Sequence, residues 1–84
     1  MQLASEEALA AAMAGRGIAI AGAGARGGRQ IDDIARLVSM YGGEAADWAK
    51  MSTGRTVNGV RVEVHWYENV RTGQRVEFKT PWDH

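Results

Sequence analysis

The C-terminal third of the chain alternates between apolar and polar side chains, a period of two that is typical of half-buried β-strands. Every second residue is apolar in residues 60–66, and the alternation returns in residues 75–79. These two segments predict a β-hairpin with one apolar face. The opposite face then carries charged and hydrogen-bonding side chains: Arg61, Glu63, His65, Tyr67, Arg75, Glu77 and Lys79.

The loop of this hairpin decides which residues face one another. A three-residue loop, Arg71-Thr72-Gly73, places glycine where a positive φ is needed. A loop of two or four residues would shift the register by one and turn the apolar face of one strand toward solvent. The three-residue loop therefore predicts four cross-strand pairs: Val70 with Gln74, Tyr67 with Glu77, Trp66 with Phe78, and His65 with Lys79.

Helical spacing dominates the preceding half of the chain. Ser5 is a suitable N-cap for a short first helix that ends at Gly15 or Gly17. A second helix is predicted over residues 31–41 from apolar residues three and four apart, and Gly42-Gly43 ends it. The residues of its apolar face are Ile31, Ile34, Ala35, Val38 and Tyr41.

A third, short helix is predicted over residues 44–51, where Ala45, Trp48 and Met51 recur at a helical interval. Asn58-Gly59 is a strong signal for a two-residue hairpin, which predicts a brief extra strand over residues 55–57. The expected fold class is α+β, with N-terminal helices packed on the apolar face of a small antiparallel β-meander.

The glycine-rich segment before the second helix predicts a linker. We therefore divide the chain into residues 1–27, a helix followed by a Gly/Ala-rich linker, and residues 28–84, the α+β domain. Gly22, Gly24 and Gly27 match G-x-G-x-x-G, the dinucleotide-binding pattern. That pattern requires a parallel βαβ unit, and the remaining chain is too short for a doubly wound sheet. A flexible segment is the favoured interpretation, with nucleotide binding as a weak alternative.

Composition narrows the possible functions. The 84 residues suffice for one small domain, and the absence of cysteine excludes disulfides and thiolate ligands. A formal net charge of zero argues against nucleic-acid binding by bulk charge alone. The sequence contains neither a basic secretory signal nor a membrane-spanning apolar run, so neither a signal peptide nor an anchor is expected.

The polar face of the hairpin contains the residue types that metal-free RNA cleavage needs. A base takes the proton of the ribose 2′-OH, cations stabilise the phosphorane, and an acid protonates the leaving oxygen. His65 is the candidate base or acid, and Lys79 opposite it favours the neutral imidazole. Glu63 and Tyr67 are expected to assist. The candidate substrate-binding residues are Arg61, Arg75, Lys50 and Trp82, the last by stacking on a base.

No cofactor is predicted, and no metal site either. His65 and Glu63 supply too few ligands, and the neighbouring cations oppose a divalent ion. The simpler interpretation of the polar face of the hairpin is a solvated strand face with mixed charges and no catalytic role.

The segments YGGEAADWAKMS and NGVRVEVHWYENVRTGQRVEFKT resemble the C-terminal toxin domains of bacterial polymorphic toxins, including contact-dependent growth inhibition and Rhs-type proteins. The resemblance covers residues 28–80. Its clearest elements are Asp47-Trp48 with Lys50, the strand with Glu63, His65 and Tyr67, and residues 72–79.

Many such domains are similar to the Barnase/EndoU/Colicin/RelE group. The resemblance implies helices on an antiparallel sheet, metal-independent ribonuclease activity that is often directed at tRNA, and a cognate immunity protein. It implies roles for His65 and Lys79 first, and for Glu63 and Tyr67 after them. It also implies delivery from the cell surface as part of a larger toxin that acts in the target-cell cytoplasm. Members usually have four or more strands, whereas the pattern here predicts three.

The polar face thus predicts metal-independent RNA cleavage without a nucleotide cofactor or membrane anchor, and the resemblance implies that the chain is a toxin domain bound by a cognate immunity protein. The alternative is a non-catalytic module that docks on a protein partner through Trp66, Tyr67 and Trp82.

Overall fold

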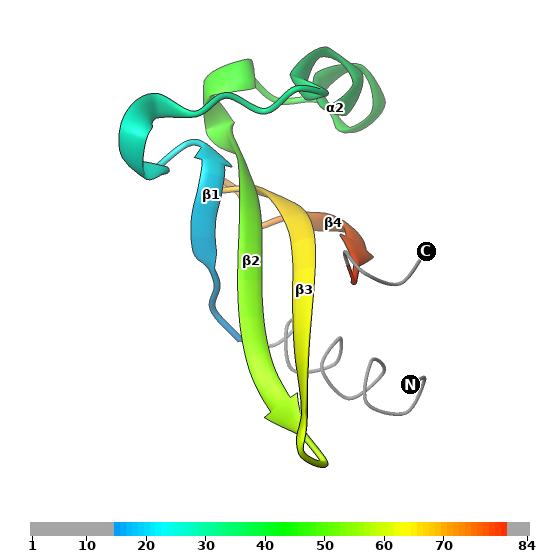
Figure 1. The fold of residues 1–84 in the computed structure, drawn as a ribbon. Coiled ribbons are helices and arrows are strands. Elements are labelled where there is room, and N and C mark those ends of the chain that lie inside the picture. The colour runs from blue at the N-terminus through cyan, green and yellow to red at the C-terminus, as the bar shows by residue number, and fades with distance from the viewer. Residues whose placement is uncertain (1–14, 81–84) are drawn as a thin grey trace.

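The computed structural model describes residues 15–80, apart from the side chains of Arg55 and Val57. One antiparallel sheet contains the four strands in chain order: β1 (Ile18–Gly22), β2 (Trp48–Val57), β3 (Val60–Asn69) and β4 (Arg75–Lys79). One α-helix, α2 (Ile34–Tyr41), lies across one end of the sheet, and the β2–β3 turn lies at the other end (Figure 1). Short 3₁₀ turns occur at Arg26–Gly28 and Ala45–Asp47.

The described region is therefore α+β, with a four-stranded sheet where three strands were predicted. Within residues 15–80 it has one α-helix rather than several. The helix predicted from Ser5 lies outside the described residues.

β2 and β3 form a long regular ribbon. Asn58 and Gly59 have φ angles of 51° and 76°, the left-handed conformation that a two-residue hairpin turn of this kind requires at both positions. The predicted turn is confirmed, and the pairing runs without interruption from Val57 opposite Val60 to Trp48 opposite Asn69.

The prediction of a short helix over residues 44–51 is wrong, because β2 begins at Trp48 and is ten residues long. Trp48 and Met51 are spaced like neighbours on a helix, but in the strand they serve opposite faces of the sheet. Trp48 packs with Leu37 of α2, whereas Met51 packs against Trp66. Tertiary burial on both faces thus overrides a weak local helical pattern.

The β3–β4 connection also differs from the prediction. The Asn69 backbone N–H donates to the Gln74 carbonyl at 2.8 Å, so the loop contains the four residues 70–73. The Asn69 side chain explains this choice, because its Oδ1 accepts from the backbone N–H groups of Arg71 and Thr72 at 3.0 and 3.2 Å. The predicted positive φ of Gly73 is confirmed at 82°.

A β-bulge in β4 compensates for the longer loop. Tyr67 pairs with Val76 rather than with Glu77, and the register then shifts so that His65 pairs with Lys79, as predicted. Glu77 is the residue that absorbs the shift, since its φ is 58° and it is not a glycine. One extra loop residue and one extra strand residue therefore cancel at the His65–Lys79 pair.

The linker predicted before the helix is instead an edge strand, because β1 pairs antiparallel with β2. Gly22 has a φ of 76°, and a Cβ atom there would lie 2.4 Å from the Trp48 carbonyl oxygen. The glycine is thus required for close packing at the end of β1. The antiparallel pairing and the 3₁₀ turn after it do not supply the parallel βαβ context of a dinucleotide site.

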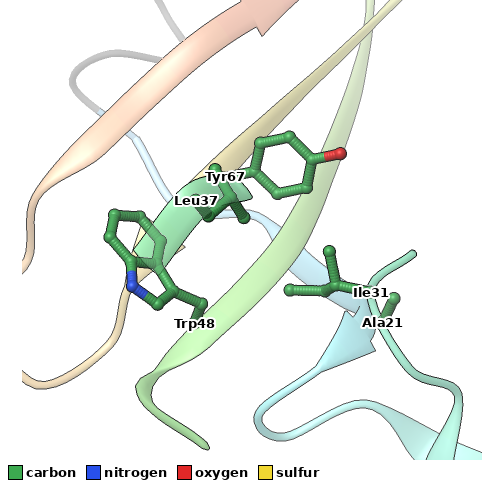
Figure 2. Packing of buried hydrophobic residues seen from close by; sticks show 5 residues of the cluster. All are labelled: Ala21, Ile31, Leu37, Trp48 and Tyr67. Atoms are coloured by element: carbon green, nitrogen blue, oxygen red, sulfur yellow. The ribbon is translucent and has the colours of Figure 1, made fainter. Parts of the chain in front are cut away.

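Two apolar clusters lie on the two faces of the sheet. Val62, Val64 and Trp66 of β3 form one of them, with Met51 and Phe78 packed against it. The other joins α2 to the sheet and contains Ala21, Ile31, Leu37, Trp48 and Tyr67 (Figure 2).

The expectation that the helix covers the alternating apolar face is wrong. α2 packs on the face that carries Tyr67, and it covers only the end of that face near Trp48. The rest of this face remains open for polar residues.

Candidate functional site

His65 and Glu63 form a hydrogen-bonded pair on β3. Residues two apart on a strand point to the same face, and the His65 Nε2 atom lies 2.7 Å from Glu63 Oε1. The side chains are 15% and 34% exposed, so the pair is sheltered but open to solvent. Within residues 15–80, Nδ1 of His65 makes no hydrogen bond. A neutral ring that donates Nε2–H to Glu63 therefore presents Nδ1 as a base.

A polar cavity of about 370 Å³ lies beside this pair, between the open part of the sheet face and the segment that leads into α2. Its sheet side includes His65 and Tyr67 of β3, Lys79 of β4 and Lys50 of β2. Lys50 is paired with Tyr67, and Lys79 is paired with His65. Four of the eight residues predicted for the site therefore line one cavity.

Lys50 reaches this cavity for a reason that differs from the sequence argument. It was expected at the end of a short helix, but it stands in the middle of β2 and points to the same face as Tyr67. Lys50 and Lys79 thus add two cations to the lining of the cavity that His65 also lines, and cations of this kind favour an anionic ligand.

The opposite wall of the cavity was missed by the sequence analysis. It consists of Arg29, Gln30, Ile31, Asp32 and Asp33, with Ile20 and Ala21 of β1 beside it. Residues 31–33 were predicted to begin a helix, and β1 lies in the segment that was predicted to be a Gly/Ala-rich linker. Neither segment was therefore expected to form a wall of the site. Ile31 fixes this wall against the sheet, because its side chain is buried with Ala21 and Trp48. In the sequence, Ile31 was assigned to the apolar face of the helix, so it gave no indication of the wall.

Tyr67 belongs both to the core and to the cavity. The residue is 7% exposed, and its ring packs with Leu37 and Trp48, while its hydroxyl points away from them (Figure 2). Burial raises the pKa of the Tyr67 hydroxyl, and the negative charge of Asp33 adds to this. Tyr67 is therefore a hydrogen-bond donor at neutral pH. Its hydroxyl makes no hydrogen bond within the described residues.

The prediction that Arg75 shares a face of the sheet with His65 is wrong. The four-residue loop pairs Arg75 with Glu68, so its side chain lies on the other face, 5.2 Å above the Trp66 ring centroid. Its guanidinium is 2.9 Å from Glu68 and also donates to the carbonyl oxygen of Gly15 at 2.6 Å. These contacts give Arg75 a structural role.

The remaining predicted substrate-binding residues do not line the cavity. Arg61 points to the same face as Glu63 but lies nearer the β2–β3 turn, over the backbone of Gly54. Trp82 lies outside the described residues. Trp66, which the alternative docking model needs, is only 1% exposed, and its ring stacks on Phe78 with centroids 5.4 Å apart.

Glu77 belongs to a structural ion-pair network rather than to the cavity. Its carboxylate accepts two hydrogen bonds from Arg36, at 2.7 and 2.8 Å, and a third from the Tyr41 hydroxyl at 2.8 Å. The Arg36 guanidinium and then the Tyr41 hydroxyl lower the pKa of Glu77 to about 2, while the same bond raises the pKa of Tyr41. Glu77, at the bulge, thus links the edge strand β4 to α2 through these hydrogen bonds.

Two further structural findings concern other classes of function. Among the described residues, no three His, Asp or Glu side chains gather as a metal-binding group. No helix within residues 15–80 has the length and apolar character needed to cross a membrane.

No family model, curated protein or solved structure matches this chain.

Proposed function

We propose that this chain is a metal-independent ribonuclease toxin domain that cleaves RNA, with tRNA as the expected substrate and a cognate immunity protein as its inhibitor. The observation that carries the proposal is the His65–Glu63 pair beside a polar cavity that also contains Lys50 and Lys79. A sheltered imidazole, an orienting carboxylate and two cations supply the groups that metal-free cleavage at the 2′-OH requires.

The reaction begins when Nδ1 of His65 takes the proton of the ribose 2′-OH. The 2′-oxygen bonds to phosphorus, the bond from phosphorus to the 5′-oxygen breaks, and the protonated imidazole returns its proton to that oxygen. The products are a 2′,3′-cyclic phosphate and a 5′-hydroxyl. Glu63 holds the ring in one tautomer by accepting its Nε2–H, in the way that a carboxylate orients a catalytic histidine.

The cations act on the phosphate during this reaction. Lys79, across the strand pair from His65, stabilises the negative charge of the phosphorane. Lys50 and Arg29 hold the flanking phosphate oxygens in place of Arg75, whose guanidinium is engaged on the other face. Tyr67 donates a hydrogen bond from the floor of the cavity.

The test is cleavage of bulk tRNA in EDTA by the wild type, His65→Ala and Lys79→Ala. We expect each substitution to reduce the rate by about 100-fold or more, since general acid–base and electrostatic groups contribute factors of this size. Arg71→Ala is the control, because this cation is 74% exposed at the β3–β4 loop and does not line the cavity. Equal cleavage by all four proteins would remove the proposed site.

A second readout concerns the toxin assignment. Cytoplasmic expression of the wild type in bacteria should arrest growth, and His65→Ala should relieve the arrest. Growth arrest that is equal for both proteins would show that toxicity does not depend on this cavity.

A further inference from the structure

The cavity wall opposite the catalytic pair carries charges that the cleavage reaction does not use. Asp32 and Asp33 line the cavity together with the groups proposed for catalysis. Carboxylates beside a phosphate oppose its binding, so their presence needs another explanation. Asp33 is 3.7 Å from Arg36 and its side chain is 59% exposed, whereas the structure gives Asp32 no ion pair within residues 15–80.

A second observation also indicates a ligand at this wall. Tyr67 is more than nine-tenths buried, yet its hydroxyl has no hydrogen-bond partner among the described residues and belongs to the cavity lining. Figure 2 shows the ring packed among apolar side chains with the hydroxyl on the side away from Trp48. Although the ring is buried, the hydroxyl is open to the cavity, so it can hydrogen-bond a polar group bound there.

We propose that Asp32 and Asp33, with the Tyr67 hydroxyl, form a base-recognition wall that selects a nucleobase rich in N–H donors next to the scissile phosphate. This inference rests on the proposed ribonuclease function and adds a substrate preference to it. The cations on the sheet side hold the phosphate, and the carboxylates on the opposite wall accept hydrogen bonds from the base.

The chemistry of the four RNA bases predicts an order of preference. Guanine presents two adjacent donors, its ring N–H and its amino group, which one carboxylate accepts together. Adenine and cytosine present one amino group each beside a ring acceptor. Uracil has no amino group, and the two carbonyl oxygens that flank its single N–H repel a carboxylate. The wall should therefore favour guanine most and uracil least.

The binding test uses the four nucleoside 3′-monophosphates, which resemble the product side of the cleaved bond, and measures their affinities by NMR titration. Wild-type protein should bind 3′-GMP more tightly than 3′-UMP by roughly tenfold, the discrimination that one good bidentate contact provides. Asp32→Asn and Asp33→Asn, singly and together, should remove most of this difference. Equal affinities in the wild type, or an unchanged preference in the double variant, would overturn the inference.

Cleavage assays separate this inference from the proposed function. Oligonucleotides that differ only in the base 5′ of the cleaved bond should show the same order of rates, and the double variant should lose the order while still cleaving. Asp47→Asn is the matched control, because this carboxylate lies near Arg71 and does not line the cavity. Cleavage without base preference would defeat the recognition wall alone, whereas base-selective binding without any cleavage would defeat the ribonuclease proposal.

Discussion

The two hairpins of the sheet share β3 but differ in regularity. The β2–β3 hairpin closes through a two-residue turn and stays in one register over its whole length. The β3–β4 hairpin has a four-residue loop and a bulge at Glu77. The regular β2–β3 hairpin holds His65 and Glu63 in place. The irregular β3–β4 hairpin positions Lys79 opposite His65 and brings Glu77 into contact with α2. The candidate site therefore depends on two departures from ideal pairing, the longer loop and the bulge, which compensate for each other.

The largest expected effect concerns the end of the sheet that α2 covers. Leu37 is completely buried in the cluster with Trp48 and Tyr67, so Leu37→Ala should lower the free energy of unfolding by about 3 kcal/mol. Val60→Ala, at a position 41% exposed beside the β2–β3 turn, should change it by less than about 0.5 kcal/mol. Urea denaturation of both variants measures the difference. Similar losses would show that α2 does not anchor the fold more strongly than the far end of the ribbon.

The next largest effect concerns the register of β4 against β3, in which the bulge offsets the longer loop. A glycine inserted between Phe78 and Lys79 moves Lys79 to the other face of β4, because a shift of one residue reverses a strand's faces. Cleavage should fall by about 100-fold, as for loss of the cation itself. Deletion of Glu77 removes the bulge but leaves Lys79 opposite His65, so cleavage should stay within a few-fold of wild type. The reverse pattern, activity after insertion and loss after deletion, would refute the register argument.

The smallest effect concerns acid stability. The pKa of Glu77 is about 2 in the folded protein, below its ordinary value of 4.5, so its stabilising contribution is complete above pH 4.5 and is lost as pH falls toward 2. Glu77→Gln should therefore melt roughly 5 °C below wild type at pH 6, and the gap should close near pH 2. Thermal melts at several pH values, followed by circular dichroism, measure this. A gap that does not depend on pH would mean that the carboxylate charge is not what joins β4 to α2.

The sequence was sufficient where local chemistry decides the structure. Asn58-Gly59 predicted its turn, the alternation in β3 predicted the strand, and both together placed His65 and Glu63 on one face. It was insufficient where tertiary contacts decide. The Asn69 side chain, which selects the longer loop, and the αL conformation of Glu77, which restores the register, have no signature in a hydrophobic pattern.

The same distinction applies to the site. Residues on β3 were placed correctly because strand periodicity fixes a face, whereas Arg75 was misplaced by the single-residue error in the loop. The wall formed by Arg29, Gln30, Asp32 and Asp33 could not be predicted, since it depends on β1 and on the burial of Ile31. Its acidic residues come close to the hairpin only after the chain has folded.

The chemistry of the cleaved RNA ends shows directly whether the 2′-oxygen is the nucleophile. Wild-type protein in EDTA is incubated with an RNA of defined sequence and with the same RNA carrying a 2′-deoxy sugar at the cleaved position. Attack by the 2′-oxygen should give a 2′,3′-cyclic phosphate and a 5′-hydroxyl from the first RNA and no cleavage of the second. Products with a 5′-phosphate, or cleavage of the deoxy-substituted RNA, would contradict attack by the 2′-oxygen and the role of His65 as its base.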